Sequence, residues 1–143
     1  MTQMRVIVAD DAAPMLSMVA DILRESFRIV ALVPDGRAAL DTVLKLEPDL
    51  IVLDISMPGM TGIEVARKLH ESGDKTKIVF LTLYEAPAAC LAAGALGYVT
   101  KILMHTDLIP AIHEALAGRV FVSRFSSQRE TRPARRSSMR STI

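Results

Sequence analysis

Hydrophobic residues follow two alternating patterns along the chain. Five short runs rich in β-branched and aliphatic residues predict buried strands at residues 5–9, 28–33, 49–53, 77–81 and 98–100. Each run precedes a segment whose apolar spacing or alanine content is typical of a helix, at residues 15–27, 39–44, 63–69, 86–93 and 108–116. The pattern therefore predicts a strand followed by a helix, repeated along the chain.

The predicted strands are continuous apolar runs rather than alternating ones, so both faces of each strand should be buried. Strands of this kind, alternating with helices, predict an α/β fold in which helices sandwich a parallel sheet. Hydrophobicity falls sharply near Ser123. We therefore expect one folded domain over residues 1–123, followed by a disordered segment over residues 124–143.

Composition agrees with a single packed domain. The chain has 143 residues, of which 50% are hydrophobic, 23% charged and only 4% aromatic, so the core should be aliphatic. The single cysteine, Cys90, rules out an intrachain disulfide and a zinc cluster, and we expect it to be a small buried hydrophobe. Because the chain lacks a long apolar run and a signal-peptide pattern at its start, we expect a cytoplasmic protein with no membrane partner.

The net charge of +1 conceals an uneven distribution. Residues 124–143 contain six arginines and one acidic residue, Glu130, whereas residues 1–123 carry a net charge of −4. Such a basic segment could contact nucleic acid nonspecifically, but a solvated tail is the more ordinary interpretation. We therefore expect no DNA binding without a further domain.

Polar side chains follow four of the predicted strands. Asp10 and Asp11 come after the first strand, Asp54 after the third, Thr82 after the fourth and Lys101 after the fifth. Ligands of open parallel sheets bind at the carboxyl ends of the strands, where these groups should meet. Three carboxylates at one place would repel each other unless a cation lies among them, and ligands that are all oxygen favour Mg²⁺. The sequence thus predicts phosphoryl transfer involving a carboxylate.

Four motifs carry a resemblance to a known family. They are the Asp10-Asp11 pair, Val-Leu-Asp-Ile-Ser-Met-Pro-Gly-Met-Thr-Gly at residues 52–62, Phe-Leu-Thr at 80–82 and Gly-Tyr-Val-Thr-Lys at 97–101. Over residues 4–122 the chain resembles the receiver domain of two-component response regulators. Its closing residues, 114–122, resemble the branch that usually precedes a helix-turn-helix DNA-binding domain. The resemblance implies a flavodoxin-like, doubly wound, five-stranded parallel sheet of order 2-1-3-4-5 with five helices.

The resemblance also implies roles for the acidic residues. Asp54 would be the phosphoacceptor, taking a phosphoryl group from the phosphohistidine of a sensor histidine kinase. Asp11 would bind Mg²⁺ directly, Asp10 would help through water, and Asp54 and the backbone carbonyl of Ser56 would complete the protein ligands.

Three further residues would respond to the phosphoryl group. Lys101 would pair with its oxygens, Thr82 would move to capture one of them, and Tyr98 would swing with Thr82. Such a change makes a two-state switch whose equilibrium the phosphoryl group biases.

The segment between Thr82 and Lys101 departs from the family pattern. It is about three residues shorter than in receivers of this kind, which is close to one helical turn. We expect the loss to fall in the fourth helix, so that residues 86–93 form at most about two turns and are the least stable helix. Coupling through that surface is then in doubt, and we expect output through the fifth or first helix.

The favoured function is therefore a phosphorylation-controlled switch with a histidine kinase and an output partner, with self-association as one form of output. An aspartyl phosphatase is a second possibility, but such enzymes carry an Asp two residues after the nucleophile, where this chain has Ser56. A phosphorylation-independent interaction module and a transcription regulator without its DNA-binding half stay open.

Overall fold

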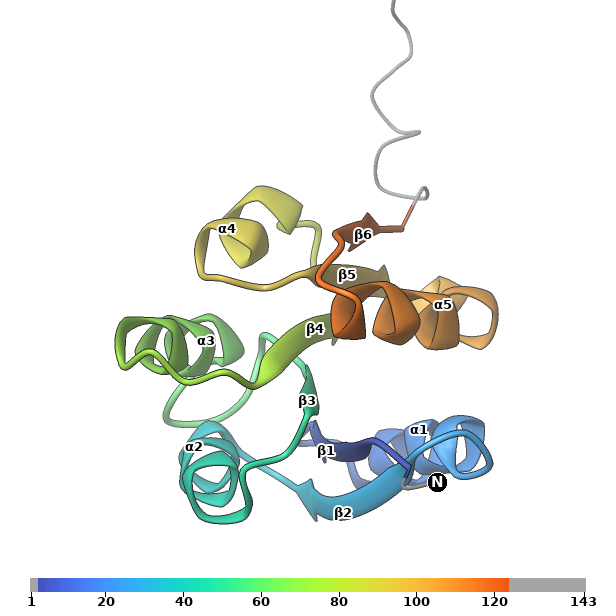
Figure 1. Cartoon of the computed structure of the whole chain (residues 1–143), viewed down its shortest axis with the longest axis horizontal. Helices are drawn as coiled ribbons and strands as arrows, with labels where there is room; N and C mark the ends of the chain where they lie inside the picture. The colour runs from blue at the N-terminus through green and yellow to red at the C-terminus, as the bar shows by residue number, and fades with distance from the viewer. Residues whose placement is uncertain (1–2, 124–143) are drawn as a thin grey trace, which may run out of the picture.

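The computed structural model describes residues 3–123, which form a parallel sheet covered by helices on both faces (Figure 1). The strands, in the spatial order β2-β1-β3-β4-β5-β6, are β1 (Arg5–Ala9), β2 (Arg28–Val33), β3 (Leu50–Leu53), β4 (Lys77–Thr82), β5 (Gly97–Thr100) and β6 (Phe121–Val122). Every neighbouring pair is parallel. All carboxyl ends of the strands therefore lie on one edge of the sheet.

The helices divide between the two faces of the sheet. Helices α1 (Ala13–Leu23) and α5 (Met104–Leu116) cover one face, whereas α2 (Gly36–Leu46), α3 (Gly62–Glu71) and α4 (Pro87–Ala92) cover the other (Figure 1). A short 3-10 turn, η1 (Lys101–Leu103), leads into α5. The doubly wound arrangement expected from the sequence is confirmed.

Local polar residues start two of these helices. The side chain of Asp35 accepts a hydrogen bond from the Ala38 N–H at the beginning of α2. At the beginning of α3, Thr61 accepts from the Glu64 N–H while the Glu64 carboxylate accepts from the Thr61 N–H, which is a capping box. These caps fix where each helix leaves the carboxyl edge of the sheet.

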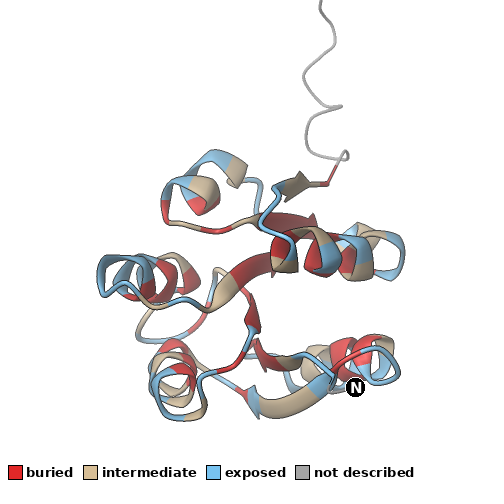
Figure 2. Cartoon of the chain, viewed as in Figure 1, coloured by how far each residue is buried: buried red, intermediate tan, exposed pale blue. Residues whose placement is uncertain are grey.

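The core consists of two apolar layers, one on each face of the sheet (Figure 2). Strand β3 is buried along its whole length. Ile51 and Leu53 belong to the layer under α2 and α3, while Leu50 and Val52 belong to the layer under α1 and α5. Because successive side chains of a strand alternate between faces, burial on both faces requires the continuous apolar run seen in the sequence.

The sheet differs from the expected one by an additional strand. The sequence predicted five strands, and the structure adds the two-residue β6, which pairs in parallel with β5 at the edge of the sheet. Two residues are too few to show a strand periodicity in the sequence. The pairing of β6 with β5 depends instead on where the chain runs after α5. The segment 124–143, expected to be a disordered basic tail, lies outside the described residues.

Helix α4 is as short as expected. It has six residues, whereas α1, α2, α3 and α5 each have ten or more. Pro87 stands in its first turn. The shortened segment between β4 and β5 is therefore absorbed by this helix, and the two strands keep their register, with Thr82 beside Thr100. That α4 is also the least stable helix stays a prediction.

Cys90 lies on the buried side of α4 and is fully inaccessible, as expected for a small hydrophobe. Burial raises the pKa of its thiol to about 12, so the reactive thiolate is scarce at neutral pH. We expect the folded protein to react with a thiol reagent such as dithionitrobenzoate far more slowly than the unfolded chain. Reaction at equal rates with and without denaturant would contradict this burial.

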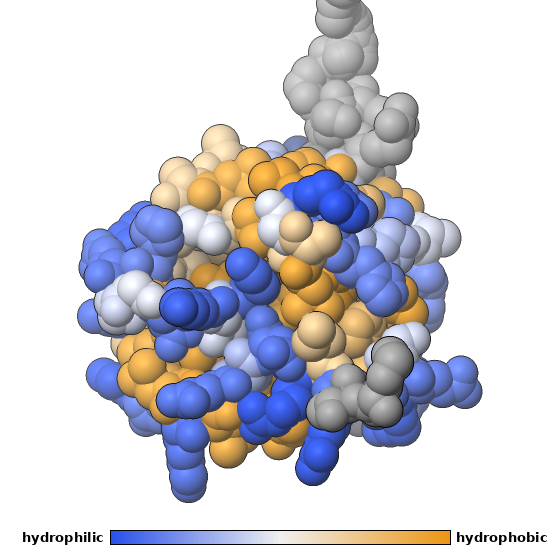
Figure 3. Space-filling view, in the orientation of Figure 1, coloured by the Kyte–Doolittle hydropathy of each residue, from blue (hydrophilic) through white to orange (hydrophobic). Residues whose placement is uncertain are grey.

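The surface mixes polar and apolar side chains. In the face seen in Figure 3, hydrophilic residues cover α3, and hydrophobic residues gather near β6 and the end of α5. No helix within residues 3–123 has both the length and the apolar character needed to cross a membrane.

Candidate functional site

The predicted acidic residues meet at the carboxyl edge of the sheet. Asp10 and Asp54 directly follow β1 and β3, and their backbone N–H groups donate to the carbonyls of Val33 and Ala9, which extends the strand pairing by one residue. Lys101 follows β5 and opens η1. The backbone of the sheet therefore fixes the place from which each of these side chains reaches the site.

Lys101 joins the two buried carboxylates. Its Nζ lies 2.7 Å from Asp10 Oδ2 and 3.2 Å from Asp54 Oδ2. The side chains of Lys101, Asp10 and Asp54 are only 11%, 4% and 7% exposed. The single ammonium thus pairs with two carboxylates and offsets one of their two negative charges, away from bulk water, where an unpaired charge is costly.

The second oxygen of each buried carboxylate accepts a backbone hydrogen bond. Asp10 Oδ1 accepts from the Ala12 N–H at 2.9 Å, and Asp54 Oδ1 accepts from the Ile55 N–H at 2.8 Å. These bonds hold the two carboxyl planes in place. The site is therefore organised before any ligand enters it.

Burial and charge act in opposite directions on Asp54. Desolvation by burial raises its pKa above the ordinary value, and the nearby Asp10 carboxylate adds to this, while the Lys101 ammonium opposes it. For Lys101, burial acts to lower the pKa, but the hydrogen bond to Asp10 and the charges of both carboxylates outweigh it, so that the pKa is raised. Lys101 therefore stays charged at neutral pH.

Asp11 completes an acidic cluster. One carboxylate oxygen from each of Asp10, Asp11 and Asp54 lies within 4.8 Å of the others, and Asp11 is exposed whereas the other two are buried. The cluster opens into a hollow of about 230 Å³ whose lining also includes Ser56 and Lys101. Donors that are all oxygen, beside an open space, suit a hard cation such as Mg²⁺. The residues present therefore fit the metal expected from the sequence.

Thr82 and Tyr98 lie beside the site and are fully buried. Thr82 Oγ1 accepts from the Tyr84 N–H at 3.1 Å. The Tyr98 hydroxyl donates to the Tyr84 carbonyl and accepts from the Ala86 N–H. Both side chains therefore hold the loop that follows β4, and neither is among the residues that line the hollow.

The structure adds residues that the sequence did not single out. Leu83 and Tyr84 form one wall of the hollow and are largely exposed. Gly62 lies so close to the loop after Asp54 that a Cβ there would be 1.9 Å from the Asp54 carbonyl oxygen. Its place in the Pro-Gly-Met-Thr-Gly motif was visible in the sequence, but the need for close packing against Asp54 was not.

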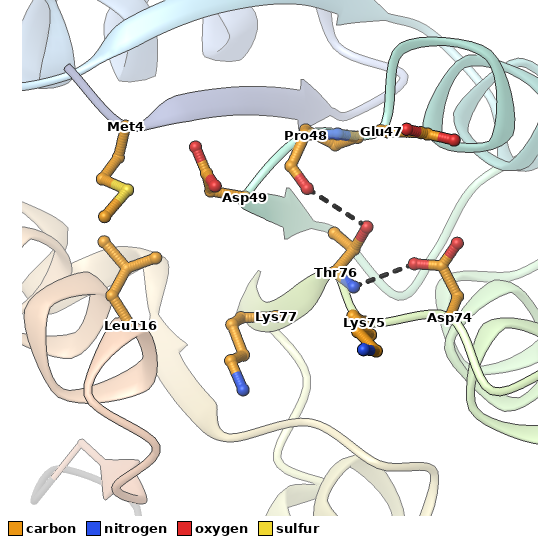
Figure 4. Close-up of a pocket in the computed structure, with 9 residues that line it drawn as sticks. All are labelled: Met4, Glu47, Pro48, Asp49, Asp74, Lys75, Thr76, Lys77 and Leu116. Atoms are coloured by element: carbon orange, nitrogen blue, oxygen red, sulfur yellow. Dashed lines mark hydrogen bonds between the residues drawn. The ribbon is translucent and has the colours of Figure 1, made fainter. Parts of the chain in front are cut away.

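A larger hollow, of about 450 Å³, lies at the opposite, amino edge of the sheet (Figure 4). Two of its acidic side chains accept backbone hydrogen bonds, Asp49 from the Arg5 N–H and Asp74 from the Thr76 N–H. The convergence of carboxylates and an ammonium is found at the carboxyl edge. The candidate site is therefore the smaller hollow.

Comparison with known proteins agrees with this geometry. Residues 6–113 match the model of the response regulator receiver domain. The chain belongs to the receiver domain family of response regulators. It is similar to the response regulator GacA of Pseudomonas viridiflava, with 34% identity over 83% of this chain and 58% of the relative. The oxygen regulatory protein NreC of Staphylococcus epidermidis is also 34% identical, over 83% of this chain and 57% of that protein.

Solved structures show the same receiver fold. A LuxR-family two-component response regulator from Aurantimonas has a TM-score of 0.82 at 29% identity, covering 89% of this chain and 94% of that one. The signal receiver domain of NarL from Mycobacterium tuberculosis has a TM-score of 0.77 at 30% identity, covering 83% of this chain and 100% of that one. The LuxR-family match agrees with the branch expected from residues 114–122. The receiver spans less than two thirds of the length of the curated relatives described above.

Proposed function

We propose that this receiver is a phosphorylation-controlled switch whose phosphoacceptor is Asp54. The observation that carries the proposal is the position of this carboxylate, which is buried at the end of β3, 3.2 Å from the Lys101 ammonium and beside two further carboxylates. An ammonium and a hard-cation site next to one carboxylate match the needs of phosphoryl transfer.

The phosphoryl group passes from the donor to Asp54. A carboxylate oxygen of Asp54 attacks the phosphorus of a phosphohistidine on a sensor kinase, the new P–O bond forms, and the P–N bond breaks with its electron pair passing to the imidazole. Lys101 lies where its ammonium can pair with the phosphoryl oxygens. Asp10, Asp11, Asp54 and the Ser56 carbonyl would hold Mg²⁺, which when bound offsets the negative charge of the phosphoryl group.

Thr82 and Tyr98 are proposed to carry the change onward. Thr82 leaves the Tyr84 N–H when its hydroxyl turns to a phosphoryl oxygen, which releases one of the bonds that hold the loop after β4. The Tyr98 hydroxyl holds the same loop through Tyr84 and Ala86. The phosphoryl group can shift this equilibrium only by the difference in its interactions with the two states.

The proposal is tested by the mass of the intact protein after incubation with acetyl phosphate and Mg²⁺. We expect a gain of one phosphoryl group, which is lost again slowly by hydrolysis. If the mass stays unchanged with and without Mg²⁺, the proposal of a phosphorylation switch is wrong, and a module that binds its partner without phosphorylation is the better interpretation. The short α4 is the feature that favours this second candidate.

Asp11 is expected to supply most of the accessible charge for the metal, because it is the exposed member of the cluster. Asp11→Ala should weaken Mg²⁺ binding by about tenfold or more, since the two carboxylates that remain, Asp10 and Asp54, both pair with the Lys101 ammonium and hold a hard cation less well. Titration calorimetry measures this directly. Asp41→Ala, which removes an exposed carboxylate from α2, serves as the matched control and should bind Mg²⁺ as the wild type does.

The same geometry argues for signalling rather than turnover. Ser56 stands two residues after Asp54, where an aspartyl phosphatase would place its acid–base carboxylate. We therefore propose that the chain assists only its own phosphorylation and slow dephosphorylation. A histidine kinase is the proposed donor, the output is a protein partner or a second copy of the chain, and DNA binding would need a further domain.

A further inference from the structure

Strand β6 and Ser123, the residue after it, are hydrogen-bonded to β5. The backbone N–H groups of Phe121 and Ser123 donate to the carbonyls of Leu96 and Tyr98, at 2.9 and 2.8 Å. Ser123 is fully buried although the described chain ends with it. The segment that leaves the domain is therefore attached to β5, the strand that carries Tyr98 and leads into Lys101.

The Ser123 hydroxyl connects three elements. It donates to Asp107 Oδ2 on α5 at 2.9 Å and accepts from the Thr100 N–H at 3.3 Å. Thr100 precedes Lys101 directly, and it lies beside Thr82 in the register of β4 and β5. The Ser123 hydroxyl thus links the end of β6 to Thr100, the neighbour of both Lys101 and Thr82.

The side chain of Thr100 makes fewer hydrogen bonds than its backbone does. Thr100 is only 4% exposed, and its Oγ1 has no hydrogen-bond partner within residues 3–123. A buried hydroxyl without a partner is disfavoured, so Oγ1 does not help to hold Thr100 in this place. The bond from its N–H to Ser123 is also the longest of those described for Ser123.

We propose that residues 121–123 form a strap that is docked on β5 in the unphosphorylated state and is released when Asp54 is phosphorylated. Lys101 is now drawn to Asp10, at 2.7 Å, more closely than to Asp54. A phosphoryl group on Asp54 draws Lys101 and Thr82 toward itself and moves Thr100, which adjoins Lys101 in the chain and Thr82 across the strand pair, away from Ser123. Release opens the Leu96 and Tyr98 carbonyls on the sheet edge.

This strap rests on the proposed phosphorylation of Asp54, and it gives the signal a route that bypasses the short α4. Coupling of this kind is reciprocal for binding, so loss of the docked strap must raise the affinity of the site for a phosphoryl mimic by the same factor. We therefore expect phosphorylation to loosen residues 121–123, and loss of the Ser123 link to tighten binding of a phosphoryl mimic at Asp54.

The first measurement is amide exchange of the full chain before and after incubation with acetyl phosphate and Mg²⁺, with intact mass recorded on the same samples. We expect the Phe121 and Ser123 amides to exchange about tenfold faster once the phosphoryl group is present, as for a coupling of ordinary size. The Asp49 and Lys77 amides, which pair at the opposite edge of the sheet, should not change.

The second measurement is the affinity for beryllium fluoride with Mg²⁺. Ser123→Ala removes the hydroxyl link and should tighten binding at least about threefold. Thr106→Ala is the matched control, because it removes another hydroxyl partner of Asp107 without touching β5, and it should bind as the wild type does.

The outcomes separate the two proposals. A phosphorylated protein whose Phe121 and Ser123 amides exchange at the original rate or more slowly overturns the strap and leaves the switch intact. A protein that gains no phosphoryl mass overturns both. Equal affinities of Ser123→Ala and the wild type for the mimic also overturn the strap.

Discussion

Asp54→Asn is expected to abolish phosphoryl uptake from acetyl phosphate completely, because an amide cannot act as the attacking carboxylate. The substitution keeps the shape of the side chain and an oxygen that can accept from the Ile55 N–H. Intact mass after incubation with Mg²⁺ measures the effect. Asp41→Asn, on the exposed surface of α2, should take up the phosphoryl group at the wild-type rate.

The stability of Asp54→Asn serves as the control for folding. Since the pKa of Asp54 is raised in the folded state, the native protein binds this proton more readily than the unfolded chain does, and the free energy of unfolding falls as pH rises through the folded pKa. Asparagine does not ionise, so the variant avoids this loss of unfolding free energy. The variant should therefore be at least as stable as the wild type at pH 7, and the difference should shrink toward acid pH.

The assignment of Asp54 as phosphoacceptor would be contradicted if the folded Asp54→Asn variant still takes up the phosphoryl group.

Much of the fold could be predicted because its signals are local. The β3 run is continuous and apolar because both faces of that strand are covered, and this requirement is written in the residues themselves. The ends of β1 and β3 then place Asp10 and Asp54 together, since parallel strands share one carboxyl edge. The shortening of α4 followed from the spacing of Thr82 and Lys101, which must keep their places on adjoining strands.

Features that depend on the return of the chain after α5 could not be predicted. Ser123 stands where hydrophobicity falls, which marked it as a boundary, yet it is buried and bonded to Thr100 and Asp107. A single serine at the end of an apolar segment gives no sequence signal that it will be buried. Lys101 Nζ lies 2.7 Å from Asp10 and 3.2 Å from Asp54, and sequence spacing does not determine a difference of this size.

Lys101→Met is expected to have the largest effect on stability, because it leaves two buried carboxylates without their ammonium. Removing one partner of a buried ion pair costs about 3–5 kcal/mol of unfolding free energy. Chemical denaturation at pH 7 without divalent metal measures this loss. Lys68→Met on the exposed side of α3 should change the unfolding free energy by less than about 0.5 kcal/mol.

Two conditions should reverse much of the loss in Lys101→Met, and each follows from the charges at the site. Without the ammonium, the pKa of Asp54 rises further above its ordinary value, so the folded variant takes up protons as pH falls and its deficit against the wild type shrinks between pH 7 and pH 4. Mg²⁺ at a hundred times the variant's dissociation constant adds about 2.7 kcal/mol to its unfolding free energy, because the cation binds the folded cluster and not the unfolded chain. The wild type should gain less at the same Mg²⁺ concentration, since its ammonium competes with the cation for Asp10 and Asp54, so the deficit narrows. A deficit that stays the same at every pH and Mg²⁺ concentration would mean that Lys101 stabilises the fold through packing of its alkyl chain rather than through the pairing of its charge with Asp10 and Asp54.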